Sequence, residues 1–296
     1  MATMKVQERE ADSKTKTLVV VFDTLQVLGI VLLLALLAPA LFSPNVKRTA
    51  TWFGMIVSII ICCVSYSILM FVGGQEGSEP SAGVCLFQAC LVHSTPIFGV
   101  SCALGFIMDL SVSFFCTFLE KTPPRVTPII LLASSSLLFL IGVLDTLAVG
   151  LANPKVVQRN ESHLYCHITT PAFTLVFCVI GVTITFATII AEVAMVVIIR
   201  KTMGKLRRQS GSPNTELPTR LLVRLFSFSV CMCIALCINV YSIFVPSKGS
   251  ALSAWYVLLN TVPIGGVVTF ATQKDILCFY FQRRTLIRAE VVTVDR

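Results

Sequence analysis

Long apolar runs separated by short polar segments dominate the chain. The runs are rich in Leu, Ile, Val and Phe and lack the alternation of a β-strand, and each is long enough to cross a bilayer as a helix, which takes about 20 residues. The pattern therefore predicts an all-α bundle of seven transmembrane helices. A transmembrane β-barrel is excluded, since its strands would appear as alternating segments of about ten residues. The predicted spans are 17–42, 51–72, 84–119, 127–151, 172–199, 220–245 and 252–272.

The third run is long for one span and too short for two spans with a turn, so we expect one tilted helix that extends past the bilayer. The first run carries Ala38-Pro39-Ala40, which could imitate a signal-peptidase site and would leave six spans if cleaved. The acidic residues before this run, and its length, favour a retained helix. The predicted organisation is an N-terminal tail (1–16), the bundle (17–272) and a C-terminal tail (273–296).

Composition supports an integral membrane protein. Of the 296 residues, 55% are hydrophobic and 13% are charged, whereas a soluble domain carries about 25% charged residues. The net charge of +8 does not indicate nucleic-acid binding, because the basic residues form short clusters beside apolar runs. Membrane lipid is the expected surrounding.

The distribution of Lys and Arg predicts the orientation, since cytoplasmic loops are enriched in both. Sixteen of the 23 basic residues fall on the side of the C-terminus and seven on the side of the N-terminus. The N-terminus is therefore expected outside and the C-terminus in the cytoplasm, in a multi-pass protein of the plasma membrane. The sixteen are Lys47, Arg48, Lys121, Arg125, Arg200, Lys201, Lys205, Arg207, Arg208, Arg220, Arg224, Lys274, Arg283, Arg284, Arg288 and Arg296.

The polar segment 153–171 falls outside in this orientation. It contains the sequon Asn160-Glu161-Ser162, a candidate glycosylation site only if it faces the secretory lumen. Most of the twelve cysteines lie inside apolar runs or on the basic side, which leaves Cys85 at the outer start of the third run and Cys166 in the segment 153–171. A disulfide between them is plausible in that oxidising compartment, the alternative being two unpaired thiols at the interface.

Candidate catalytic and metal-binding groups are few. The three histidines form no metalloprotease motif, and the chain has neither a nucleophile elbow nor a glycine-rich phosphate loop. His163 and His167 are four residues apart, but no third nitrogen ligand for zinc is nearby. We therefore expect no enzyme, no cofactor and no metal site, and we expect both histidines at the surface.

Polar residues within or at the ends of the spans suggest an outward-opening ligand pocket, because ionisable groups at membrane depth usually face protein or water. The alternative for each is a hydrogen bond between helices. The candidate pocket residues are Asp23, His93, Asp145, Asn239 and Asn260.

At the opposite end, helical rise places Asp109 and Glu192 near the cytoplasmic surface, where Arg220 and Arg224 begin the sixth span. Contacts between these acids and bases would form a latch whose opening frees the sixth helix. The alternative is that the side chains extend to the lipid–water interface.

Two cytoplasmic segments are candidate contact regions. The loop after the fifth span is basic and suits an acidic partner or lipid head groups, and its Ser210 and Ser212 are candidate phosphorylation sites. The segment "KDILCFYFQRR" after the seventh span predicts an interfacial helix, with Cys278 as a candidate for palmitoylation.

Several motifs carry a resemblance. The stretches "LFSPNVKRTATWF", "SYSILMFVGGQ", "CLFQACLVHSTP", "YCHITTP" and "AEVAMVVIIRKTMGKLRR" are similar to seven-helix receptor-like proteins of basidiomycete fungi. The topology resembles G-protein-coupled receptors, but the chain does not look rhodopsin-like, since it lacks Asp-Arg-Tyr, Cys-Trp-x-Pro and Asn-Pro-x-x-Tyr at the expected positions. The resemblance implies membrane signalling.

The leading hypothesis is a receptor that transduces an extracellular ligand to a heterotrimeric G protein through its inner loops. The alternative is a small multispan transporter or channel, for which internal repeats or broken helices are expected. Pro96, Pro263 and Gly265-Gly266 could break helices, but we see no repeats. A membrane enzyme using His93 and a carboxylate is disfavoured by the scarcity of histidine.

Overall fold

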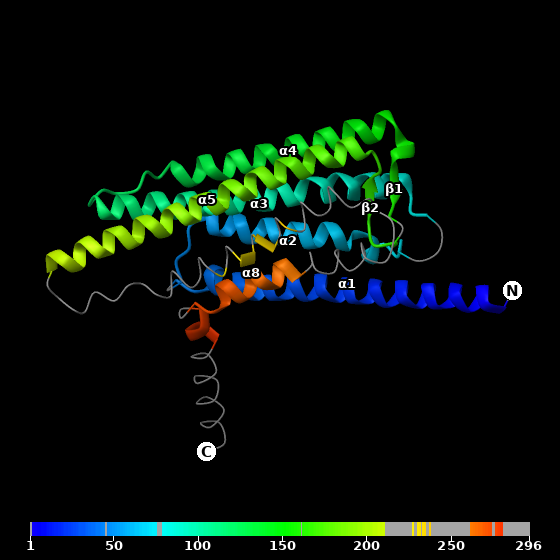
Figure 1. Ribbon diagram of the computed structural model, residues 1–296, viewed down its shortest axis with the longest axis horizontal. Coiled ribbons are helices and arrows are strands. Elements are labelled where there is room, and N and C mark those ends of the chain that lie inside the picture. Colours follow the sequence, from blue (N-terminus) through cyan, green and yellow to red (C-terminus); the bar gives the residue numbers. More distant parts are fainter. Residues whose placement is uncertain are drawn as a thin grey trace, which may run out of the picture.

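A computed structural model of the chain is nearly all-α, as the apolar runs predict (Figure 1). It describes residues 2–44, 46–75, 79–160, 162–210, 261–273 and 276–280, together with six positions between 227 and 237; within these ranges the side chains of 2–15, 117–118, 202–210 and 261 are not described. The elements are α1 (Ala2–Phe42), α2 (Ala50–Phe71), α3 (Ala82–Phe118), α4 (Thr127–Ala152), η1 (Pro154–Val156), β1 (Val157–Arg159), β2 (Cys166–Ile168), α5 (Pro171–Ser210) and α8 (Thr261–Ala271).

Five helices are long and apolar enough to cross a membrane, and they correspond to the first five predicted spans. Their candidate spans are Lys16–Phe42, Ala50–Phe71, Ala82–Cys116, Thr127–Ala152 and Pro171–Lys201. The sixth predicted span, 220–245, is described at six positions, all helical, and the seventh is described from residue 261 onward, mainly as α8.

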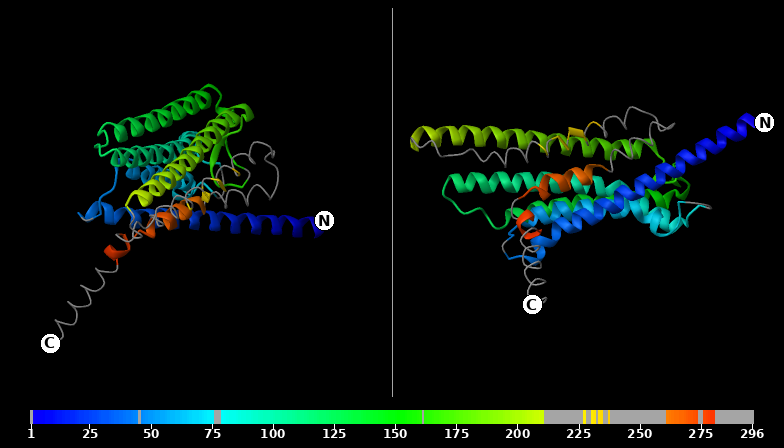
Figure 2. Two further views of the ribbon diagram at one scale, coloured as in Figure 1. Left: turned by 60° about the vertical axis from the view of Figure 1, so that its left-hand side comes forward. Right: turned by 90° about the horizontal axis from the view of Figure 1, so that it is seen from below.

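The first helix is longer than its apolar run. It begins at Ala2 and has 41 residues, which corresponds to about 60 Å, or twice the hydrocarbon thickness. The segment 2–16 contains no glycine or proline, and Glu10 and Asp12 each precede a lysine by four residues, a spacing that supports a helix. α1 therefore projects beyond the hairpin end of the bundle (Figure 1) and is inclined to the other long helices (Figure 2).

Local signals delimit α2 at both ends. Before its first turn, the hydroxyl of Thr49 accepts a hydrogen bond from the backbone N–H of Trp52. After its last turn, Gly73 adopts a positive φ of 67°, and the N–H of Gly74 bonds to the carbonyl of Leu69. This arrangement is a Schellman motif, which favours glycine at the left-handed position.

The third helix is the hub of the bundle, since it packs against α2, α4, α5 and both strands. It is one helix of 37 residues that continues through Pro96, which confirms the single long helix predicted here. Glycines let α4 pack closely against its neighbours. A Cβ on Gly54 of α2 would lie 2.2 Å from Leu132 of α4, and one on Gly150 of α4 would lie 2.3 Å from Leu86 of α3.

The proline in α1 explains one contact with the C-terminal region. Pro39 has no N–H, so it leaves the carbonyl of Ala35, four residues earlier, without its helical partner. The hydroxyl of Tyr280 donates a hydrogen bond to that carbonyl. Nearby, Ile276 is buried in the main core cluster, which also contains Leu33 and Leu36 of α1. The helical residues 276–280 are thereby attached to α1.

Candidate functional site

The polar segment between α4 and α5 folds into a small antiparallel hairpin of β1 and β2. β1 and β2 pair with Gln158 opposite His167. Next to the hairpin, the N–H of Thr169 bonds to the carbonyl of Val156, and the N–H of Asn160 bonds to the carbonyl of Tyr165. In an antiparallel ladder of this register, the N–H groups of Cys166 and Ile168 point away from β1.

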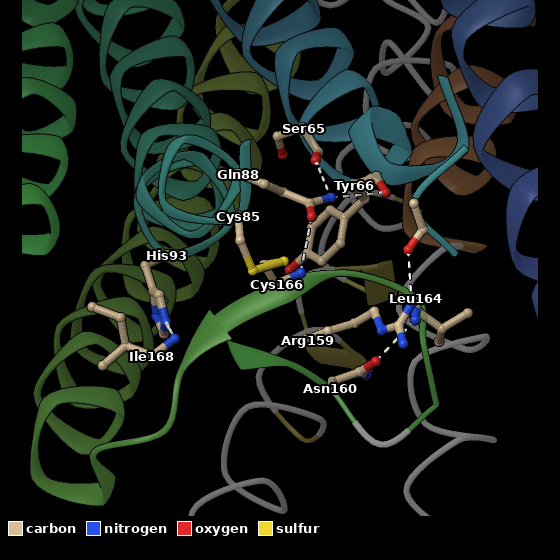
Figure 3. The surroundings of a disulfide bond; sticks show 11 residues. Ser65, Tyr66, Cys85, Gln88, His93, Arg159, Asn160, Leu164, Cys166 and Ile168 are labelled. Carbon is tan, nitrogen blue, oxygen red and sulfur yellow. Dashed lines mark hydrogen bonds between the residues drawn. A yellow bond between two sulfur atoms is a disulfide. The ribbon is translucent and has the colours of Figure 1, made fainter. Parts of the chain in front are cut away.

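Side chains of α3 accept hydrogen bonds from both outward N–H groups of β2 (Figure 3). The Oε1 atom of Gln88 lies 2.9 Å from the backbone nitrogen of Cys166, and Nε2 of His93 lies 3.1 Å from that of Ile168. Gln88, which is fully buried, also donates through Nε2 to the carbonyl of Ser65 in α2. A strand edge that would otherwise be unsatisfied is therefore bonded to α3.

A disulfide between Cys85 and Cys166 joins the same two elements. The two Cα atoms are 5.2 Å apart, and both residues are buried. The predicted pairing is thus present in the structure. Cys85, Gln88 and His93 lie along one face of α3, because residues three to four positions apart in a helix point in similar directions.

Asn160 closes the hairpin turn. Its Oδ1 atom accepts a hydrogen bond of 2.9 Å from the N–H of Leu164, and its carbonyl accepts one from the N–H of His163. The residue is only 8% exposed. Asn160, the acceptor residue of the predicted sequon, therefore stabilises the turn in the folded chain.

The tip of the hairpin packs into the bundle. Leu164 and Tyr165 are buried against Phe22 of α1 and Val92 of α3. The ring of Tyr165 also meets that of Tyr66 in α2 edge to face, with centroids 5.2 Å apart. The hairpin therefore contacts α1, α2 and α3 simultaneously.

Polar contacts join the hairpin to the turn between α2 and α3 and, through this turn, to α1. Arg159 donates to the carbonyl of Gly74, and Nδ1 of His163 lies 3.3 Å from the carbonyl oxygen of Gln75. The side chain of Gln75 in turn donates to Asp23 of α1. Asp23, predicted to line a pocket, therefore contributes to a contact between an outer turn and a helix.

The structure separates the remaining predicted pocket residues. His93 faces β2 and the rings of Phe173 and Phe177 in α5, whereas Asp145 is exposed on α4. Among the described residues, no hydrogen bond or ion pair joins any two of Asp23, His93 and Asp145. Asn239 and Asn260 lie outside the described residues.

The expectation that both loop histidines are surface residues is wrong, because His163 and His167 are each about half-buried. Burial lowers the pKa of His167, while a backbone hydrogen bond with Gln158 opposes this shift. Across the described part of the chain, no group of three or more His, Cys, Asp or Glu side chains could hold a metal ion.

At the opposite end of α3, Asp109 is buried and its carboxyl accepts a hydrogen bond of 2.7 Å from Thr51 of α2. Glu192 of α5 is also buried and interacts electrostatically with Cys231. Both acids are thus buried inside the helix bundle. Their proposed basic partners, Arg220 and Arg224, lie outside the described residues.

Arg48 contacts both the first turn of α2 and the segment that follows α8. Its guanidinium lies 5.6 Å from the centroid of the Trp52 ring and donates to the side chain of Gln273. Cys278, the candidate for palmitoylation, is exposed. The side chain of Ser210 and all of Ser212 lie outside the described residues.

Three polar residues that join elements of the bundle were not predicted from the sequence. Gln88, Gln75 and Thr51 each donate a side-chain hydrogen bond to another element. Gln88 had a usable signal, because a glutamine in a long apolar run has to find partners within the protein. Gln75 and Thr51 lie at helix ends, where polar residues are common and carry no such signal.

Comparison with known proteins adds no identification. No protein-family model matches the chain, and no curated protein matches it.

Proposed function

We propose that this chain is a seven-helix receptor of the cell surface that transduces an extracellular ligand to a heterotrimeric G protein. The observation that carries the proposal is the position of α3. One end of this helix is joined by a disulfide to an outer hairpin, and the other end holds the buried carboxyl of Asp109 beside α2. The sequence resemblance to receptor-like proteins agrees with this function.

The directions of the helices support seven spans. α8 packs along α1 in the same direction, since Pro263 approaches Gly29 while Gln273 bonds to Arg48 at the end of the α1–α2 connection. The helical positions between 227 and 237 run opposite to α8. Ser227 bonds to Thr269, and Cys231 lies against Gly265. A sixth span that crosses the membrane outward after α5, followed by a seventh span that crosses back inward, would produce these contacts.

Orientation follows from the same geometry and the positive-inside rule. The N-terminus and the hairpin lie at one end of the bundle (Figure 1). The basic residues Lys47, Arg48, Lys121 and Arg125 lie in the connections at the other end. That end is the cytoplasmic one by the positive-inside rule.

A ligand would act by favouring one of two packings of the bundle. The inner halves of α3 and α5 hold Asp109 and Glu192, and Cys231 beside Glu192 belongs to the predicted sixth span. A rearrangement of these contacts would let that span move and expose a cytoplasmic surface for the G protein. Arg220 and Arg224 are the proposed basic partners of the two acids.

Nucleotide exchange on a purified heterotrimeric G protein tests this function, with the chain reconstituted in lipid nanodiscs. Glu192→Gln and Asp109→Asn remove the acidic contacts, and we expect each to raise basal exchange about fivefold, within the usual range of coupling energies. Asp145→Asn, an exposed acid on α4, is the matched control and should leave exchange unchanged. Absence of exchange for all proteins, together with solute uptake into reconstituted vesicles, would favour the transporter or channel.

Introduced sequons test the orientation separately. Ala2→Asn with Met4→Thr creates an acceptor site at the N-terminus, and Val291→Asn creates one in the C-terminal tail. Both proteins carry Asn160→Gln so that the native sequon adds no glycan, and we expect a glycosidase-sensitive shift for the first protein and none for the second. The reverse result would place the hairpin in the cytoplasm and contradict the receptor topology.

A further inference from the structure

The two bonds that hold the outer edge of β2 differ in chemistry. Cys166 donates to the amide oxygen of Gln88, which does not titrate. Ile168 donates to Nε2 of His93, an imidazole nitrogen that accepts only while it carries no proton. Two N–H groups on the same edge of β2 are thus bound by different acceptors (Figure 3). The amide oxygen accepts at any pH, whereas the imidazole nitrogen stops accepting when it is protonated.

We propose that the hydrogen bond between Ile168 and His93 is a protonation-sensitive latch that holds the outer hairpin, and the start of α5, against α3. In the latched state the ring is neutral, with its proton on Nδ1. When Nε2 takes a proton from water, both ring nitrogens become donors. The N–H of Ile168 then faces another N–H, and the hydrogen bond is lost.

The surroundings of His93 offer no compensation for the added charge. From α5, the rings of Phe173 and Phe177 pack edge to face against the imidazole. From β2, His167 is the titratable group that interacts electrostatically with it. Asp145 of α4 is exposed and has no interaction with His93 within the described chain, and Asp109 lies 16 residues further along α3. Among the described residues, no carboxylate therefore interacts with a proton on His93, and a proton on His167 would oppose it.

Release is local because the hairpin has other anchors. Cys166 stays attached through the disulfide and Gln88, two residues before Ile168. On the other side, α5 begins at Pro171, three residues after Ile168. Loss of the latch frees the strand end that leads into α5, while the turn and the tip remain seated. The device thus couples external pH to the outer end of α5.

The rate at which a phosphine reductant cleaves the Cys85–Cys166 disulfide measures the opening, since both cysteines are buried in the latched state, at 5% and 0% exposed. The full-length protein in lipid nanodiscs is assayed between about pH 7.5 and about pH 4.5, a range that spans the ordinary titration of imidazole. We expect reduction to be at least about tenfold faster at the acidic limit, since each unit of pH below the ordinary imidazole pKa of about 6.5 raises the open population by up to about tenfold.

The control variants separate the latch from general acid effects. His93→Gln supplies an acceptor that does not titrate, as Gln88 does, and should remain slow at both pH values. His167→Gln keeps His93 and should retain the acceleration. A wild-type rate that is the same at both limits would overturn the proposal, even if no variant folds. An acceleration that persists in His93→Gln, or disappears only in His167→Gln, would also overturn it.

Discussion

The two ends of the bundle are held together in different ways. We call the hairpin end the outer end and the opposite end the inner end, after the proposed orientation. At the outer end, one hairpin is fixed by a disulfide, by backbone bonds to α3 side chains, and by a buried tip between α1, α2 and α3. At the inner end, pairs of side chains make single hydrogen bonds, such as Thr51 with Asp109 and Arg48 with Gln273. Several hydrogen bonds and a disulfide therefore hold the same hairpin at the outer end, whereas each of these two inner hydrogen bonds joins a different pair of segments.

This difference matters for how a helical protein can switch. Removing one outer bond leaves the hairpin attached through the others, so the outer end keeps one arrangement over a range of conditions. Removing one inner bond leaves a buried polar group that needs a new partner, which favours an alternative packing. The variants below measure the two kinds of contact, beginning with the largest expected effect.

Loss of the disulfide tests the strongest outer anchor. Cys85→Ser removes a bond between residues 81 positions apart, and we expect it to lower the free energy of unfolding by about 2–5 kcal/mol. Thermal unfolding in detergent provides the measurement. Cys278→Ser changes an exposed free cysteine and should leave the melting temperature unaltered. A Cys85→Ser protein as stable as its parent would show that the disulfide adds nothing to the other anchors.

Gln88→Leu tests the non-covalent part of the same anchor. The change deprives the N–H of Cys166 and the carbonyl of Ser65 of their buried partner, and should cost about 2–3 kcal/mol in thermal unfolding. Gln158→Leu serves as the control because that side chain is exposed and bonds only locally, to Lys155. Equal losses in the two glutamine variants would contradict the role assigned to Gln88.

Thr51→Val addresses the inner end. Valine has nearly the shape of threonine but cannot donate to Asp109, and we expect a loss of about 1–2 kcal/mol. The exposed Thr174, whose hydroxyl bonds only locally to the carbonyl of Thr170, allows a matched Thr174→Val control with little effect. If Thr51→Val also raises basal G-protein activation, the inner contact restrains the inactive packing. An increase in stability would argue that Asp109 prefers another partner.

The smallest effect is expected at Tyr280. Tyr280→Phe removes the donor to the Ala35 carbonyl and should cost about 0.5–1 kcal/mol. In a Pro39→Ala background the new N–H of residue 39 can serve that carbonyl, so Tyr280→Phe should then cost almost nothing. Equal costs in the two backgrounds would show that the hydroxyl acts independently of the proline.

Apolar periodicity predicted the helices but not their polar contacts. Run length alone located α2, α3 and α4 to within two residues at each end, because the membrane sets both length and composition. It located the start of α5 equally well, but this helix continues to Ser210, eleven residues past the predicted span. The start of α1 at Ala2 was missed, since its first 15 residues are polar and form a helix through local propensity and charge spacing.

The site was only partly predictable. The Cys85–Cys166 pair could be found because few cysteines lie outside the apolar runs. The partners of His93 and Asp23 could not, because they are a backbone N–H of the hairpin and the side chain of Gln75 in a turn. Which groups meet depends on how the hairpin and the turn are seated on the helices, which has no sequence pattern. His93 was predicted as a pocket residue, yet its ring nitrogen bonds to the N–H of Ile168.

The burial of Asn160 has a consequence for biosynthesis. Glycosylation requires access to the side-chain nitrogen, but in the finished hairpin this side chain is 8% exposed and bonded to the backbone. The transferase can therefore reach it only before the strands pair and the cysteines join. In the proposed orientation, a glycan on Asn160 would mark molecules in which sugar addition preceded closure, and the glycosylated fraction would report how quickly this hairpin folds.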